Sequence, residues 1–163
     1  MDLLVIRHGI AEERVPHEDD AARRLTRTGE RRIRGVVRGL RGLGWKLDRI
    51  LTSPWLRAAR TAELLEKLSR TEADVTELLV RSPSAELLAL VSESATTKKH
   101  HATAVVGHEP WLGELVGWLA FGDGRFGDGL GLKKGAVVWL EGDVVPGGMT
   151  LRGLLPPNVL RAI

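Results

Sequence analysis

The chain begins with a short apolar run, Leu3 to Ile6, that leads directly into Arg7, His8 and Gly9. A continuous apolar run of this length is typical of a strand buried in a parallel sheet, and a glycine after it lets the backbone turn sharply. The pattern therefore places a guanidinium and an imidazole at the carboxyl end of a strand, where open α/β sheets bind their ligands. Because a nearby positive charge disfavours a protonated imidazole, we expect His8 to stay neutral while Arg7 attracts an oxyanion such as phosphate.

The composition is that of an ordinary globular protein, with 43% hydrophobic and 28% charged residues. The length of 163 residues suits one domain with a sizeable core, and we expect a single domain over residues 1–163. The chain has no cysteine, which excludes disulfides, thiolate metal sites and a cysteine nucleophile. No apolar run approaches the roughly 18 residues of a membrane helix, and the first run is too short for a signal peptide, so we expect a cytoplasmic protein.

The net charge is +3, and arginine far outnumbers lysine. A basic balance raises the question of nucleic-acid binding. Acidic residues are nevertheless mixed throughout, and no zinc-finger, RRM-like or helix-turn-helix pattern accompanies the charge. We therefore interpret the charge as a solvated, arginine-rich surface and expect no nucleic-acid partner.

Strand-like apolar runs alternate with helical patterns along the chain. We predict strands at 3–6, 47–52, 75–80, 103–106, 136–140 and 149–154, and helices at 26–42, 53–68, 84–91 and 112–119. This alternation predicts an α/β fold of three layers, with a mostly parallel central sheet and helices on both faces. The glycine-dense stretch from Gly122 to Gly135 is predicted to be mobile. It contains a GxGxxG pattern but lacks the preceding strand and following helix of a dinucleotide site.

Histidine follows two of the predicted strands at equivalent places. His8 ends the first run, and His108 comes after Gly107 at the end of the strand at 103–106. If these strands lie side by side, the two histidines are neighbours at one edge of the sheet. Paired histidines can also bind a metal ion, but Arg7 would repel a cation, so we predict no metal site. The remaining histidines lack this context and are expected at the surface: His17, His100 and His101.

A third polar block lies between the two histidines. Ser53 and Pro54 are typical of a helix start, with a side-chain cap followed by proline. The first turns of this helix project Arg57, with Thr61 one turn further along the same face. The positive helix end and the guanidinium both favour an anion beside the strand ends. We expect Ser53 and Thr61 to shape the helix and orient Arg57.

These blocks together resemble the histidine phosphatase superfamily, whose fold is shared with the cofactor-dependent phosphoglycerate mutases. The resemblance is carried by Arg7-His8-Gly9, by the Ser53 to Thr61 block and by Gly107-His108. The pattern Arg-x-Leu-Thr-x-x-Gly from Arg23 to Gly29 is similar to a block of the small SixA-type phosphohistidine phosphatases, as are the compact length and the tail at 156–160. The resemblance covers nearly the whole chain and implies a phosphoglycerate-mutase-like fold.

The resemblance also implies a role for each of these residues. His8 would attack phosphorus and carry the phosphoryl group, which implies a phosphatase that needs no metal or other cofactor. Arg7 and Arg57 would hold the equatorial oxygens, His108 would donate a hydrogen bond to the same group, and Arg23 would add a phosphate contact from its loop. The second ring nitrogen of His8 is expected to donate to a backbone carbonyl, which fixes the tautomer.

No motif assigns a general acid, although Glu77, Glu86 and Glu109 lie in suitable regions. A site with cations and no acid suits phosphohistidine, because imidazole is a better leaving group than an alcohol. We therefore expect protein phosphohistidine as the substrate. The resemblance to the SixA-type branch implies a histidine-phosphotransfer protein as one candidate partner. Two alternatives remain. One is a phosphatase of a small phosphorylated metabolite, with a pocket shaped by residues 11–24 and by the Gly122–Gly135 segment and with Glu77 or Glu86 as the acid. The other is a non-catalytic phosphoprotein-binding module.

Overall fold

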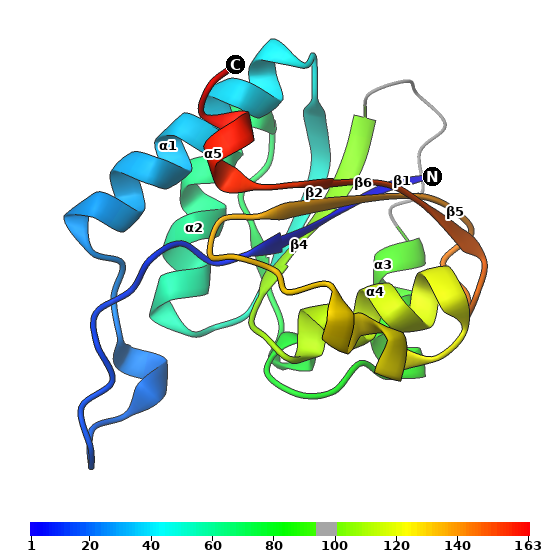
Figure 1. Ribbon diagram of the computed structural model, residues 1–163, viewed down its shortest axis with the longest axis horizontal. Coiled ribbons are helices and arrows are strands. Elements are labelled where there is room, and N and C mark those ends of the chain that lie inside the picture. The colour runs from blue at the N-terminus through cyan, green and yellow to red at the C-terminus, as the bar shows by residue number, and fades with distance from the viewer. Residues whose placement is uncertain (94–100) are drawn as a thin grey trace.

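The computed structural model describes residues 1–93 and 101–163, so His100 lies outside the described residues. Within them, a six-stranded sheet lies between two layers of helices, as Figure 1 shows. The strand order is β3-β2-β4-β1-β5-β6. The strands are β1 (Asp2–Arg7), β2 (Lys46–Thr52), β3 (Asp74–Val75), β4 (His101–Gly107), β5 (Val137–Gly142) and β6 (Met149–Leu155).

The first four strands pair in parallel, whereas β5 runs antiparallel to both β1 and β6. The prediction of a three-layer α/β fold with a mostly parallel sheet is therefore confirmed. The central strand β1 has β4 on one side and β5 on the other. His108 directly follows the neighbouring strand β4. Because β1 and β4 pair in parallel with Arg7 opposite Gly107, both histidines lie at the same end of the sheet.

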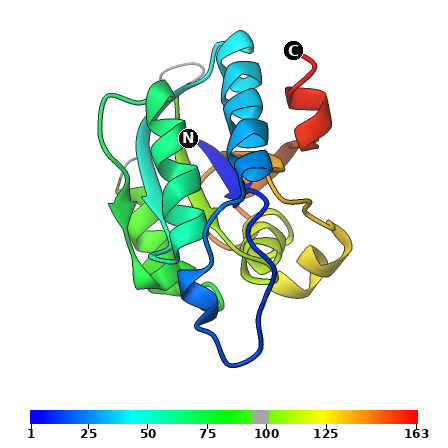
Figure 2. The same ribbon diagram turned by 90° about the vertical axis from the view of Figure 1, so that its left-hand side faces the viewer.

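Helices cover the two faces of the sheet in separate groups (Figures 1 and 2). One face carries α1 (Arg27–Gly42), α2 (Leu56–Leu65) and α5 (Pro157–Leu160), and the other carries α3 (Ala85–Ser92) and α4 (Trp111–Phe121). Side chains of β1 alternate between these layers, as the pleat of a strand requires. Leu4 and Ile6 pack in the α1/α2 layer, whereas Leu3 and Val5 pack in the α3/α4 layer. No helix in the described residues is long and apolar enough to cross a membrane.

The predicted strand at 75–80 is largely wrong. Only Asp74 and Val75 form a strand, and a 3₁₀ helix follows at Glu77–Leu79. Leu78 and Leu79 are both buried in the α3/α4 layer. A strand would send these consecutive side chains to opposite faces, so burial of both on one side favours a helical turn.

The glycine-dense stretch at 122–135, which we predicted to be mobile, contains an element that the sequence analysis did not predict. It contains a 3₁₀ helix at Gly124–Gly129, which packs directly on α4. A Cβ atom on Gly127 would lie 1.8 Å from the carbonyl oxygen of Gly113, and one on Gly117 would lie 2.6 Å from the amide nitrogen of Gly127. These glycines therefore permit close contact between two backbones. The stretch ends at Gly135, whose amide donates to the carbonyl oxygens of Arg7 and His8 at 3.0 and 3.1 Å.

Candidate active site

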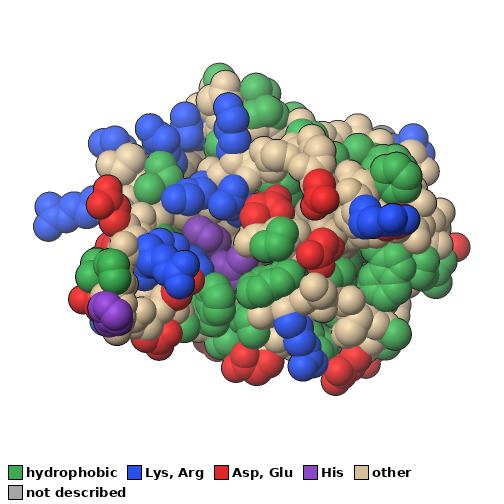
Figure 3. Space-filling view, turned by 60° about the horizontal axis from the view of Figure 1, so that its bottom comes forward, with side chains coloured by type: hydrophobic (Ala, Val, Ile, Leu, Met, Phe, Trp, Pro, Cys, Tyr) green, Lys and Arg blue, Asp and Glu red, His purple; other side chains and the backbone are tan. Residues whose placement is uncertain are grey.

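His8 and His108 lie together just beyond the carboxyl ends of the central strands β1 and β4. β1 and β4 are paired in register with Arg7 opposite Gly107, so the residues that follow both strands are adjacent. The two ring centroids are 5.1 Å apart, and the side chains are buried, with 4% and 3% exposure. Figure 3 shows histidine side chains on the floor of a hollow that is bordered by Lys or Arg side chains.

The imidazole of His8 is held in one orientation. Its Nδ1 atom lies 2.6 Å from the carbonyl oxygen of Gly9, which assigns the ring proton to Nδ1 and leaves a lone pair on Nε2. Arg57 Nε donates to that Nε2 atom at 3.2 Å. Burial lowers the pKa of His8 to about 4, and the charges of Arg57 and Arg7 add to this effect while the Gly9 carbonyl opposes it. His8 is therefore neutral near pH 7 and its ring is held in place, a state suited to nucleophilic attack.

Arg57 lies in the first turn of α2 and is almost fully buried. Its two terminal nitrogens donate to Asp20, Nη1 to the carbonyl oxygen at 2.5 Å and Nη2 to Oδ2 at 2.8 Å. The guanidinium carbon lies 4.7 Å from the centre of the Trp55 ring. Thr61 Oγ1 donates to the Arg57 carbonyl at 2.7 Å and accepts from the Gly9 amide at 3.1 Å, so α2 is tied to the turn that holds His8.

Ser53 differs from its predicted role as the cap of the helix. α2 begins later, at Leu56, and Ser53 Oγ accepts from the amide of Trp55 at 3.1 Å. The same oxygen lies 2.8 Å from His108 Nε2. Ser53 Oγ, which also accepts the Trp55 amide, can donate its hydroxyl proton to Nε2 or accept a proton from it, according to the tautomer of His108. This contact joins residues 55 positions apart, and no local pattern could have shown it.

His108 is neutral and has one ring nitrogen without a partner. Its Nδ1 atom is buried and makes no hydrogen bond to any described residue. In the tautomer in which Ser53 donates to Nε2, the ring proton of His108 is on Nδ1, where it can serve a ligand. Burial, with the charges of the neighbouring His8 and Arg57, lowers the pKa of His108 to about 3. The rings of Trp55 and Trp111 flank His108, with centroids 4.5 and 6.2 Å away.

Arg7 and Arg23 complete the set of cations. Arg7 Nη1 donates to the Leu132 carbonyl at 2.5 Å, whereas its buried Nε has no hydrogen-bond partner in the described residues. Arg23 Nε lies 3.0 Å from Asp20 Oδ1, an ion pair without hydrogen-bond geometry. The structure therefore brings four of the predicted residues together and links Arg23 to Arg57 through Asp20. Sequence reasoning missed Asp20, although its spacing of three residues from Arg23 was a usable signal.

Of the three candidate acids, Glu109 is the residue that lies beside the histidine pair. Glu77 and Glu86 are exposed, and Glu86 pairs with Arg81. Glu109 is half-buried, and its Oε2 accepts from the Gly113 amide at 3.2 Å. Burial raises the pKa of Glu109, although the Gly113 amide and Arg7 act in the opposite direction. With Arg7, this carboxyl lines a cavity of about 360 Å³ next to the 3₁₀ helix.

The other described histidines lie away from this site. His17 is exposed, and His101, at the start of β4, contacts Asp48 at 2.7 Å. In residues 1–93 and 101–163, no group of three or more His, Asp or Glu side chains is arranged to hold a metal ion. The site is thus built from imidazoles and guanidiniums, a set suited to a phosphoryl group.

Comparison with known proteins agrees with this geometry. The family model for branch 1 of the histidine phosphatase superfamily matches residues 3–80. An uncharacterized protein of Picosynechococcus sp. is 38% identical over 145 residues, which cover 86% of this chain and 85% of that protein. The chain belongs to the histidine phosphatase superfamily.

Within this superfamily, the chain is similar to SixA. Phosphohistidine phosphatase SixA of Escherichia coli is 28% identical over 125 residues, which cover 76% of each protein. A structure of the protein histidine phosphatase SixA complexed with tungstate has a TM-score of 0.77 and 27% identity, covering 98% of this chain and 99% of that one. These matches confirm the predicted phosphoglycerate-mutase-like fold and the resemblance to the SixA-type branch.

Proposed function

We propose that this chain is a metal-independent phosphatase that hydrolyses protein phosphohistidine through a phosphohistidine on its own His8. The observation that carries the proposal is the buried, neutral imidazole whose Nδ1 is bound to a backbone carbonyl and whose Nε2 faces the Arg57 guanidinium. Such a ring has its lone pair at a fixed place beside a cation that attracts phosphate.

The reaction has two steps in this proposal. The Nε2 lone pair of His8 bonds to phosphorus while the bond from phosphorus to the substrate nitrogen breaks, and that nitrogen leaves with the electron pair and takes a proton from water. A second water molecule then attacks phosphorus and gives a proton to the hydroxide left by the first step, the bond to Nε2 breaks with its electron pair returning to Nε2, and inorganic phosphate leaves. Arg57 has to turn its Nε from Nε2 to a phosphoryl oxygen in the first step, because both cannot share the same N–H.

The remaining residues stabilise the transferring group. Arg7 Nε and His108 Nδ1 are buried and have no hydrogen-bond partner in residues 1–93 and 101–163. In this proposal each donates to a phosphoryl oxygen, which requires the His108 tautomer that carries its proton on Nδ1. Arg23 approaches the same region through its ion pair with Asp20. Charge on the equatorial oxygens is thereby balanced by guanidiniums and a neutral imidazole N–H.

The substrate class is proposed from the leaving group. Imidazole leaves phosphorus with little help from an acid, whereas an alkoxide needs a proton. Similarity to a phosphohistidine phosphatase supports this choice. The proposal includes a histidine-phosphotransfer protein as the client and the cytoplasm as the place of action.

One observation favours a second candidate, a phosphatase of a small phosphorylated metabolite. Glu109 lies next to His108 with a pKa raised by burial, which is the property expected of a general acid. Its cavity with Arg7 lies against the glycine-dense stretch, which would then form part of the substrate pocket.

Hydrolysis of two substrates with a chelator present tests the choice. A phosphohistidine peptide and a sugar phosphate are offered at equal concentration, and kcat/KM is measured for the protein and for Glu109→Gln. We expect the peptide to be preferred and the variant to retain its rate on the peptide. Preference for the sugar phosphate, lost in Glu109→Gln, would replace the proposal with the second candidate, and no hydrolysis of either substrate would contradict both.

A further inference from the structure

Asp20 joins two of the arginines that the proposed function assigns to phosphate. It begins a short 3₁₀ turn, Asp20–Ala22, within a largely exposed segment that runs from Glu12 to Arg24. One carboxylate oxygen accepts from Arg57 Nη2 at 2.8 Å, and the other lies 3.0 Å from Arg23 Nε. The carbonyl oxygen of the same residue accepts from Arg57 Nη1. A single residue therefore occupies both terminal nitrogens of Arg57 and faces Arg23.

This pairing differs from an ordinary surface ion pair because its cation is buried. The Arg57 side chain is 4% exposed, against 28% for Asp20. A buried guanidinium needs a nearby anion, and removal of such a partner is costly. Burial raises the pKa of Asp20, but the hydrogen bond and charge of Arg57, with the charges of other arginines, outweigh it and leave the pKa below its usual range. Asp20 is thus a carboxylate near pH 7, facing buried positive charge.

A carboxylate and a phosphoryl group present similar pairs of oxygens to a guanidinium. A phosphoryl group next to Nε2 of His8 would contact the Nε edge of Arg57, which consists of Nε and one terminal nitrogen. Arg57 Nε donates to His8 Nε2, and both terminal nitrogens of Arg57 already donate to Asp20. Two anions facing the same guanidinium also repel each other.

We propose that Asp20 is a positioning residue that competes with the phosphoryl group for Arg57 and Arg23, and so sets how weakly the enzyme holds product phosphate. The inference rests on the proposed function. The carboxylate keeps the buried guanidinium oriented between turnovers and displaces phosphate after hydrolysis. Segment 12–24 is exposed enough for this turn to shift without disturbing the core.

Inorganic phosphate binding tests this proposal without turnover. Asp20→Asn keeps the size of the side chain and an acceptor oxygen but removes the charge, and we expect its Kd for phosphate, measured by titration calorimetry, to fall about tenfold. With a phosphohistidine peptide, KM should fall with the Kd, and kcat should fall as well because phosphate leaves more slowly. Asp20→Glu retains the charge and should return the Kd toward that of the unaltered protein.

Asp19→Asn is the matched control. Asp19 is exposed, its Oδ1 caps the same turn through the Ala21 amide, and asparagine caps as well as aspartate does. This variant loses the same charge one residue away, so its Kd should stay within about twofold of the original. Equal tightening in both variants, or weaker phosphate binding in Asp20→Asn, would overturn the inference while leaving the proposed function intact. Failure of the unaltered protein to bind phosphate would overturn both.

Discussion

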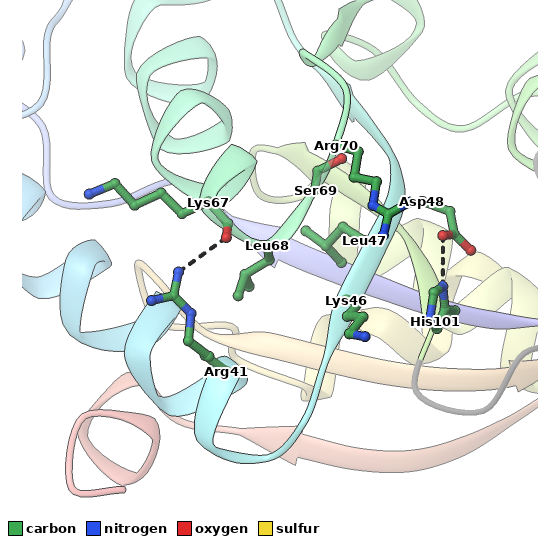
Figure 4. A pocket seen from close by; sticks show the side chains of 9 residues that line it. All are labelled: Arg41, Lys46, Leu47, Asp48, Lys67, Leu68, Ser69, Arg70 and His101. Atoms are coloured by element: carbon green, nitrogen blue, oxygen red, sulfur yellow. Dashed lines mark hydrogen bonds and ion pairs between the residues drawn. The ribbon is translucent and has the colours of Figure 1, made fainter.

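Two groups of cationic side chains lie at opposite ends of the sheet, and they differ in burial. One surrounds His8 and His108 after the carboxyl ends of β1 and β4. The other, which we call the basic cavity, lies where β2 and β4 begin, with Lys46 paired to His101. The basic cavity has a volume of about 670 Å³, against about 360 Å³ for the cavity that Arg7 and Glu109 line. Figure 4 shows its lining residues: Arg41, Lys46, Leu47, Asp48, Lys67, Leu68, Ser69, Arg70 and His101.

The cations of the basic cavity are exposed and point in different directions. Arg41 donates to the Lys67 carbonyl at 3.1 Å, and the Lys67 side chain extends away from the other labelled residues (Figure 4). Water and salt screen such charges. In the histidine site, by contrast, Arg57 is buried and hydrogen-bonded to two partners, His8 and Asp20. The two regions therefore differ in whether their cations are held in place and desolvated beside a neutral imidazole, and this is the property that we expect of a site for chemistry.

The largest difference in activity between the two regions is expected when His8 is replaced. His8→Ala should lower kcat/KM for an aryl phosphate at least about a hundredfold, because no lone pair remains to attack phosphorus. His101→Ala in the basic cavity is the control and should keep its rate. Activity retained in His8→Ala would mean that the histidine site is not the place of reaction.

The second largest loss of activity is expected when the buried guanidinium of Arg57 is replaced. Arg57→Lys should lower kcat about a hundredfold in the same assay, because one ammonium cannot replace donors that reach His8, Asp20 and phosphate together. Arg60→Lys is a matched change on the same helix, where the side chain pairs outward with Glu30 and Glu63. If both variants lost activity equally, burial of Arg57 would not be the deciding property.

The effect of desolvation on His8 and His108 can be measured directly, as the pKa values of their rings, by NMR titration. Because the pKa of His8 is about 4 and that of His108 about 3, neither ring should titrate above about pH 5.5. Both rings lose their neutral form as the pH falls through those values, so kcat/KM should fall there, after allowance for the ionisation of the substrate. The spectrum of His8→Ala assigns the signals. A midpoint near the ordinary 6.5 for either ring would contradict the electrostatic account.

The smallest effect is expected in the basic cavity. The double variant Lys46→Ala, Arg70→Ala removes two exposed cations and should change kcat/KM by no more than about twofold, because exposed charges contribute little at a distance. Measurements at low and at physiological salt separate long-range attraction from a direct role. A tenfold loss of kcat/KM at physiological salt would show that the basic cavity takes part directly in the reaction at the histidine site.

The sequence predicted the parts of this site that depend on local pattern. An apolar run followed by Arg7, His8 and Gly9 predicted a strand with a guanidinium and an imidazole at its carboxyl end. The same pattern at 103–108 predicted His108 at the end of a second strand. Contacts across the chain were missed, including Ser53 with His108 and Asp20 with Arg57, because they depend on how distant segments pack.

The errors of prediction have a similar physical cause. The 3₁₀ helix at Gly124–Gly129 was not predicted, because it depends on the close approach of its backbone to Gly113 and Gly117 of α4. At 75–80 the burial of two adjacent leucines on one side outweighed the apolar strand pattern. In both cases tertiary packing decided the local conformation.

The phosphorylated form of the enzyme tests the central claim most directly. A phosphohistidine peptide carrying labelled phosphate is mixed with the enzyme, the reaction is stopped with alkali within milliseconds, and the labelled position is mapped by mass spectrometry and NMR. The account predicts an acid-labile phosphoryl group on Nε2 of His8, absent from His8→Ala. Label on any other residue, or steady turnover by His8→Ala, would contradict it.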